Sequence, residues 1–256
     1  MITGVAAMSA LLKSEARASE LGQTFLELKT WRLHNSGEDQ AKRVSAYLEG
    51  GLFPALTRAG AKPVGAFANL IGQDGPYLVS IAQYSSLASM QEVLAKLAQD
   101  KAHEKTSRQL SDGAGVPFVR IESSLLKTLS SFPEAVLPDD AGKRPSRIFE
   151  MRTYESQSMA TLQRKAHMFN NGEIGIFQRL GMRPVFFGET IIGPRQPCIT
   201  YMLSFDKLDA REKLWQQFGS DPEWKRISAP PEMHDAEIVA NIGNVILRPL
   251  PFSPVR

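Results

Sequence analysis

In the second half of the chain, apolar residues alternate with polar ones in some segments and recur every three or four residues in others. Residues 148–154 are rich in β-branched and aromatic side chains, which predicts a strand, whereas the spacing over 159–180 predicts a helix. Gly181 follows the last apolar position of that helix, where a left-handed residue commonly ends a helix. The same pattern predicts strands at 184–191, 198–205 and 237–247, a helix with Asp209 as its N-cap, and a short helix that starts at Asp221.

The first half of the chain repeats the second. The string AGAKPVGAF around Gly60 matches LGMRPVFFG around Gly181, which gives an offset of 181 − 60 = 121 residues. The same offset aligns SSLLKTL at Ser123 with NVILRPL at Asn244, and upstream FLELKTW aligns with IFEMRTY at an offset of 148 − 25 = 123. We therefore expect matching elements in the first half, at 25–33, 40–58, 62–70, 77–84, 87–98 and 116–126.

Each half then has the element order β-α-β-β-α-β, which is that of the ferredoxin-like unit. Helices cover one face of such a sheet, and the other face needs a partner, which a second copy in the same chain supplies. We predict an α+β fold in which two tandem ferredoxin-like repeats, at 24–129 and 147–256, pack sheet to sheet as a dimeric α-β barrel. The residues between them, 130–146, contain three prolines and are expected to form a linker.

Composition and motifs exclude several function classes. The 256 residues carry a formal net charge of only +3, so we expect no nucleic-acid partner. The one cysteine, Cys198, and four histidines without ligand spacing predict no metal site. We expect no cofactor, because the chain lacks a phosphate-binding loop, a dinucleotide-binding glycine motif and a nucleophile elbow. No apolar run is long enough to predict a transmembrane segment.

The N-terminal residues 1–23 have two interpretations. The string MITGVAAMSALL is uncharged and apolar, and Ala16 begins an A-x-A pattern like that at a signal-peptide cleavage site. The basic region that precedes such a segment is missing, because the first positive charge is Lys13. Residues 1–23 are therefore either a truncated export leader, which predicts a periplasmic or secreted protein, or a disordered N-terminus of a cytoplasmic one.

Strand alternation gathers polar side chains on one face of the first strand of each repeat. We expect the more apolar set, Phe149, Met151 and Thr153, to face the helices. The opposite set would point at the facing sheet, where charges must be paired or hydrated. It either forms ion pairs between the repeats or lines a ligand cavity, together with Glu189 and Tyr201. The set consists of Glu150, Arg152 and Tyr154 in the second repeat and Glu27, Lys29 and Trp31 in the first.

Other conspicuous residues also have structural explanations. His167 lies beside the apolar stripe of the long helix, where it is either solvent-facing or a proton-transfer residue. The string DPEW satisfies the rules for a helix start, with Asp221 as N-cap, proline next and glutamate in the first turn. The helical spacing of Trp215, Phe218 and Trp224 favours core packing.

Several of these strings resemble a known family. FLELKTWRL and IFEMRTYES resemble the opening strand of NIPSNAP domains, and residues 169–226 resemble the core of that family at nearly every step. The resemblance covers most of the second half closely and the first half loosely. It implies a dimeric α-β barrel, and it supplies no catalytic residues, because none are established for the family.

Two functions stay open at this level. The first is a NIPSNAP-like barrel of unestablished activity that binds a small ligand or a protein partner and assembles into homo-oligomers. The alternative is a cofactor-independent enzyme of oxygenase or isomerase type, with Glu150, Arg152, Tyr154 and His167 acting in a polar space between the sheets. Because Glu189 corresponds to Ala68 in the first half, we expect a site to lie in the second half.

Overall fold

The computed structural model describes residues 22–37, 39–112, 115–137 and 147–256. Of the predicted leader at 1–23, residues 1–21 lie outside the described residues. Of the predicted linker at 130–146, residues 138–146 lie outside them. Within the described part of the chain, no helix is long and apolar enough to cross a membrane.

The first repeat has the predicted order of elements, with one addition, and its last strand, predicted at 116–126, begins only at Arg120. The addition is α5, which is almost entirely polar and therefore lacks the apolar stripe on which the helix predictions rested. The predicted helix at 40–58 is present as two α-helical parts joined by a π-helical turn, η1. The elements are β1 (Phe25–Arg32), α2 (Gln40–Tyr47), η1 (Leu48–Leu52), α3 (Phe53–Ala59), β2 (Lys62–Ile71), β3 (Tyr77–Tyr84), α4 (Leu87–Leu97), α5 (Lys101–Ser111) and β4 (Arg120–Thr128).

The second repeat follows the same order. Its last strand begins later than predicted, because a short helix, α10, occupies the residues just before it. The elements are β5 (Ile148–Glu155), α6 (Met159–Met168), η2 (Phe169–Glu173), α7 (Ile174–Arg179), β6 (Arg183–Ile192), β7 (Cys198–Phe205), α8 (Leu208–Ser220), α9 (Pro222–Ile227), η3 (Pro231–Met233), α10 (Asp235–Ile238) and β8 (Asn241–Pro249).

In the described residues, the eight strands form one closed barrel in the order β1-β3-β2-β8-β5-β7-β6-β4. The predicted pair of separate facing sheets is therefore joined at both edges. Strand β2 pairs with β8, and β4 pairs with β6, both antiparallel. These junctions satisfy the backbone N–H and C=O groups that an open sheet would leave unpaired at its edges.

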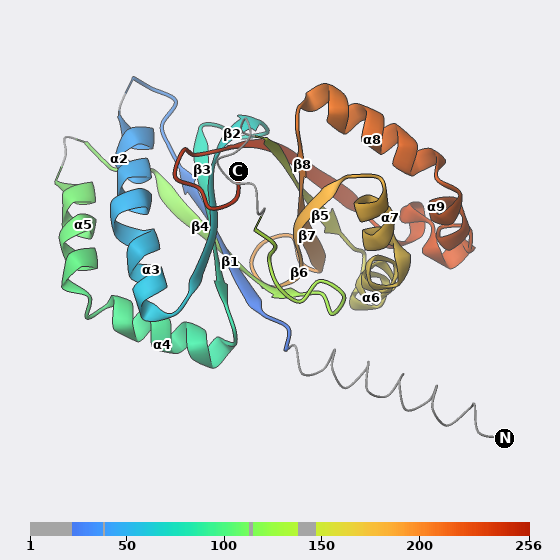
Figure 1. The fold of residues 1–256 in the computed structure, drawn as a ribbon, viewed down its shortest axis with the longest axis horizontal. Coiled ribbons are helices and arrows are strands. Elements are labelled where there is room, and N and C mark those ends of the chain that lie inside the picture. The colour runs from blue at the N-terminus through green and yellow to red at the C-terminus, as the bar shows by residue number, and fades with distance from the viewer. Residues whose placement is uncertain (1–21, 38, 113–114, 138–146) are drawn as a thin grey trace.

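The helices of the two repeats cover opposite sides of the barrel, as Figure 1 shows. One apolar cluster lies beneath the helices of each repeat. A third cluster fills the barrel itself and combines both repeats, with Leu26 and Phe67 from the first and Phe149 and Phe186 from the second. Buried Val255, near the C-terminus, and Ala135 belong to this interior cluster, where they pack against the barrel residues. The molecule thus has three cores, one inside the barrel and one beneath each helical layer.

The expected orientation of the first strands is wrong. Phe149 points into the barrel, whereas Glu150 contacts helix α8, so the polar set faces the helices and the apolar set faces the opposing strands. The physical reason is that the barrel interior is the most enclosed space and takes the most apolar side chains. The helical layer carries basic and indole groups that can pair with a buried carboxylate.

Most of the predicted helix ends are confirmed. Gly60 and Gly181 adopt the left-handed conformation after α3 and α7, with φ of 104° and 83°. The Asp221 carboxylate accepts hydrogen bonds from the backbone N–H groups at the start of α9, which confirms it as the N-cap. The predicted cap of α8 is wrong by two residues, because Lys207 is the N-cap and Asp209 lies in the first helical turn.

Candidate functional site

The predicted glutamate of the second repeat, Glu150, lies at the centre of an ion-pair network between the barrel and α8. It is fully buried, and its carboxylate accepts hydrogen bonds from Arg152 at 3.0 Å, Arg211 at 2.5 Å and the Trp215 indole at 2.7 Å. Burial alone would raise the pKa of Glu150, but the Arg211 hydrogen bond and the charge of Arg152 outweigh burial and hold this pKa below its ordinary value. The carboxylate is therefore ionised and already fully engaged.

The two predicted tyrosines lie beside this network. The Tyr201 hydroxyl donates to the Tyr154 hydroxyl at 2.9 Å, and burial raises the Tyr201 pKa well above its ordinary value. A buried lysine, Lys165, which the sequence analysis did not single out, contacts Glu173 at 3.0 Å and Asp235 at 3.3 Å. Its ammonium group also lies about 5 Å from the rings of Tyr154, Phe169 and Trp224.

The remaining predicted residues of the second repeat do not join this group. His167 is exposed on α6, where its ring contacts the Asn171 amide at 3.1 Å. Glu189 lies on β6 opposite Lys127 of β4, at the junction of the two repeats. Trp215, Phe218 and Trp224 pack in the second helical core, as their spacing predicted.

In the first repeat, the corresponding polar set also faces the helices. Glu27 accepts a hydrogen bond from Tyr84 at 2.9 Å and pairs with Lys29 at 3.1 Å. Burial, followed by the nearby Glu27 charge, raises the Tyr84 pKa above its ordinary value. Trp31 is buried and donates its indole N–H to Ser80 at 3.0 Å. The predicted sets therefore lie beneath two separate helical layers and do not meet between the repeats.

A polar cavity does exist within the barrel, but other residues line it. It has a volume of about 720 Å³ and lies at the end of the barrel where β1 and β5 finish. We call it the barrel-mouth cavity. Its floor contains Leu28, Met151 and Val245, and its rim contains Ile71 and Ile242. Its polar lining includes Thr30, Arg32, Asp74, Glu122 and Ser124 of the first repeat and Thr153, Glu155, Thr190, Arg195, Thr200 and Asn241 of the second.

The two sides of this cavity are related by the repeat offsets, and corresponding positions carry opposite charges. Arg32 of β1 corresponds to Glu155 of β5, and Asp74 corresponds to Arg195, since 155 − 32 = 123 and 195 − 74 = 121. Arg32 pairs with Glu122 at 2.9 Å, and Glu155 lies 3.9 Å from Arg195. Each side of the mouth therefore carries a cation next to a carboxylate.

Hydroxyl groups lie deeper than these charges. Thr153 and Thr200 form a hydrogen bond at 3.0 Å on adjacent strands, and Thr30 occupies the position that corresponds to Thr153. These residues were missed because strand alternation was assigned to the wrong face. Threonines that recur at inward positions one repeat apart are the signal that would have found them.

The donor set of this region suits an organic ligand better than a metal ion. Among the described residues, no group of three or more histidine, cysteine, aspartate or glutamate side chains could hold a metal ion. Hydroxyls, guanidinium groups and carboxylates over an apolar floor can instead hydrogen-bond and orient a small molecule.

Comparison with protein families identifies the two repeats. The family model described as NIPSNAP matches twice, over residues 26–131 and 149–254. The chain belongs to the NIPSNAP family. Each match spans all four strands of one repeat, so the barrel-mouth cavity is built by two NIPSNAP domains together. No curated protein matches the chain.

Two solved structures share the fold of this NIPSNAP chain at low sequence identity. A putative monooxygenase from Fusobacterium nucleatum is 10% identical, covers 90% of this chain and 93% of its own, and has a TM-score of 0.58. A putative monooxygenase from Lactobacillus acidophilus is 9% identical over 88% and 93% of the two chains, with a TM-score of 0.59. An uncharacterised NIPSNAP-like domain protein from Burkholderia xenovorans is 20% identical over 42% of this chain and 88% of its own, with a TM-score of 0.37.

Proposed function

We propose that this NIPSNAP protein binds a small polar organic molecule in the barrel-mouth cavity. The observation that carries the proposal is the cavity itself, since its volume of about 720 Å³ is in the range of small-molecule sites. Both repeats contribute polar groups to it. Binding in this space is therefore a property of the tandem chain and not of one domain.

The lining indicates the chemistry of the ligand. Thr30, Thr153 and Thr200 offer hydroxyls that can donate or accept, which favours a ligand with hydroxyl or carbonyl groups. Leu28 and Met151 form an apolar floor, and Ile71 at the rim is 54% exposed, so part of the ligand is expected to be apolar. Arginine and carboxylate on each side of the mouth suit a ligand that carries charge at its ends.

We also propose that the barrel consists of two ferredoxin-like repeats. Within each repeat the strands lie in the order 4-1-3-2, as β4-β1-β3-β2 and β8-β5-β7-β6. This order supports two ferredoxin-like repeats, with boundaries near 24–129 and 147–256, that form a dimeric α-β barrel within one chain. The ligand then occupies the axis that relates the two repeats.

Native mass spectrometry of the purified full-length chain tests the proposal. We expect a reproducible extra mass that disappears on denaturation. Replacing Ser124, which lines the cavity, by tryptophan should fill the space and remove the extra mass. Ser123→Trp is the matched control, because Ser123 immediately precedes Ser124 on β4 and is exposed on the strand face that points away from the cavity.

Two results would contradict binding at this site. One is the same ligand-free mass for the wild-type chain and for both variants. The other is an extra mass that the Ser124→Trp variant retains while its melting temperature stays near that of the wild type, because the ligand would then lie elsewhere.

No observation favours the alternative enzyme with Glu150, Arg152, Tyr154 and His167 as its catalytic groups. None of these residues lines the barrel-mouth cavity. Glu150 and Arg152 belong to one ion-pair network, and the Tyr154 hydroxyl accepts a hydrogen bond from Tyr201. His167 is exposed on the outside of α6. Their contacts support a structural role for the first three.

A further inference from the structure

A second recess lies on the outer surface of the first repeat, between the helices and the barrel. It is a groove of about 540 Å³ with an apolar floor of Leu52, Leu94 and Leu97, and Lys29 and His103 also line it. We call it the first-repeat groove. At its inner end it meets a cavity of about 20 Å³, the size of one water molecule, where Glu27 and Tyr84 lie. It is separate from the barrel-mouth cavity, because it lies on the opposite face of β1.

The groove is open because two side chains of α4 differ from those of α8. Arg211 and Trp215, which close over Glu150 in the second repeat, correspond to Met90 and Leu94, since 211 − 90 = 121 and 215 − 94 = 121. Leucine is smaller than tryptophan and offers no hydrogen bond to Glu27. Leu94 is 45% exposed, which leaves apolar surface facing solvent inside a concave site.

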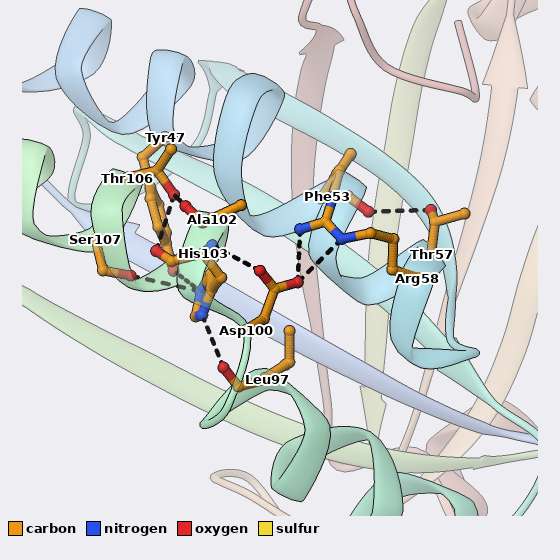
Figure 2. A network of polar contacts seen from close by, with 10 residues as sticks. All are labelled: Tyr47, Phe53, Thr57, Arg58, Leu97, Asp100, Ala102, His103, Thr106 and Ser107. Carbon is orange, nitrogen blue, oxygen red and sulfur yellow. Dashed lines mark hydrogen bonds and ion pairs between the residues drawn. The ribbon is translucent and has the colours of Figure 1, made fainter.

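Hydrogen bonds fix the far wall of the groove, as Figure 2 shows. The His103 ring contacts the Tyr47 hydroxyl at 2.9 Å through Nε2 and the Leu97 carbonyl at 3.4 Å through Nδ1. Asp100 caps α5 by accepting from the His103 backbone N–H and also pairs with Arg58. The residues of α5 that face the groove are therefore held in place.

The unused hydrogen-bonding capacity of the groove consists mainly of donors. Both oxygens of Glu27 are engaged, one by Lys29 and the other by Tyr84. An ammonium group has three N–H donors, and among the described contacts of Lys29 only the one to Glu27 uses a donor. The Lys29 side chain is 27% exposed, so its ammonium group can reach a ligand in the groove. The Tyr47 and Ser107 hydroxyls also line the wall, but both already contact the His103 ring.

We propose that the first-repeat groove is a second binding site, for an amphipathic carboxylate of the fatty-acid type. The carboxylate would accept hydrogen bonds from Lys29, and the apolar chain would lie along Leu52, Leu94 and Leu97. Apolar area removed from water supplies most of the affinity, and the charged hydrogen bond selects the carboxylate over a neutral head group.

Isothermal titration of the full-length chain with decanoate tests this site, with 1-decanol as the uncharged counterpart. Leu94→Trp restores the residue type of the second repeat and should fill the groove, so we expect decanoate affinity to fall at least tenfold. Leu87→Trp on the same helix is the matched control, because Leu87 is exposed and lines neither the groove nor the water-sized cavity. Lys29→Gln should weaken decanoate by about tenfold and leave 1-decanol unchanged.

Three outcomes would overturn the proposal. The first is no binding of decanoate to the wild-type chain, and the second is unchanged affinity in both Leu94→Trp and Lys29→Gln. The third is loss of decanoate binding in Ser124→Trp but not in Leu94→Trp, which would place decanoate in the barrel-mouth cavity. Since Ser124→Trp tests the proposed function and Leu94→Trp tests the groove, failure of one proposal is distinguishable from failure of the other.

Discussion

The two repeats have the same backbone plan but fill the layer between helices and barrel with different chemistry. In the second repeat, the buried Lys165 and Glu173 face each other beneath α6 and η2. The residues one repeat earlier, since 165 − 44 = 121 and 173 − 52 = 121, are Val44 and Leu52, which pack in an apolar core. An ion pair and an apolar pair therefore occupy equivalent places in one molecule.

This difference shows which features the fold depends on. Three of the four strand pairs keep the 121-residue offset and the first pair differs by only two residues, because barrel closure pairs every strand with two neighbours. The helical layer needs only that its side chains fill the space and that each buried polar group has a partner. The two repeats can therefore differ in this layer, so that an ion-pair network fills the space in the second repeat and a groove remains in the first.

The largest expected effect comes from breaking the buried ion pair of the second repeat. Lys165→Val leaves Glu173 buried with its lysine partner removed, and we expect a loss of about 3–5 kcal/mol in the free energy of unfolding. The double change Lys165→Val with Glu173→Leu installs the pair found in the first repeat and should recover most of this loss. Urea unfolding at pH 7 measures both variants.

The double variant decides whether the two layers are interchangeable. If it is as unstable as the single variant, the surrounding Asp235 and aromatic rings require the charge, and the apolar solution of the first repeat does not transfer. As a matched control, Leu52→Ala in the first repeat should cost about 2–5 kcal/mol through lost packing alone, and Val44→Ala should cost less because it removes fewer buried atoms.

A smaller effect is expected from opening the Glu150 network. Arg211→Met places the methionine of the first repeat opposite a glutamate that keeps its contacts with Arg152 and Trp215. Loss of one charged hydrogen bond should lower the free energy of unfolding by about 1.5–3 kcal/mol, as urea titration would measure. An unchanged stability would mean that Arg211 only covers the carboxylate and does not hold it.

The comparison also explains what the sequence could predict. The apolar pattern predicted the four strands of the second repeat, and the repeat offset carried them to the first, so that each of the eight strands in the described residues overlaps a predicted one. Alternation correctly divided β5 into two sets, with Phe149 in one and Glu150 in the other, but it carried no information on which set faced inward. That choice depended on Arg211 and Trp215, which lie 61 and 65 residues from Glu150 in sequence and whose contacts with Glu150 become visible only in the folded chain.

The candidate cavity was out of reach of the sequence for a related reason. Its lining comes from strand ends and loops of both repeats, such as Thr30, Asp74 and Arg195, which are spread along the chain. Helix α5 was missed because it contains too few apolar residues to form an apolar stripe, although its Asp100 cap matches Asp221 one repeat later.

The pH dependence of stability should report on the Glu150 network of the second repeat. The pKa of Glu150 is held below its ordinary value of 4.5, so its contribution to stability is present above pH 4.5 and is lost as the pH falls through the lower folded value. We expect the wild-type chain to lose stability in acid, and Glu150→Gln to show a flatter dependence together with a lower stability at pH 7. Urea unfolding between pH 7 and pH 3 measures both. Parallel curves for the two chains would contradict a role of this carboxylate in the acid sensitivity.

The smallest effect concerns a feature that the two repeats share. Asp100 and Asp221 each cap a short helix and pair with an arginine, Arg58 or Arg179, and both pairs are related by the 121-residue offset. Both helices have an aspartate as N-cap and an arginine as its ion-pair partner. Asp100→Ala and Asp221→Ala should therefore lower the melting temperature by similar small amounts, as measured by circular dichroism. A markedly larger drop for Asp221→Ala would mean that α9, which packs Trp224 into the second core, depends on its cap more than α5 does. The difference between the repeats would then extend from the buried layer to the helix ends.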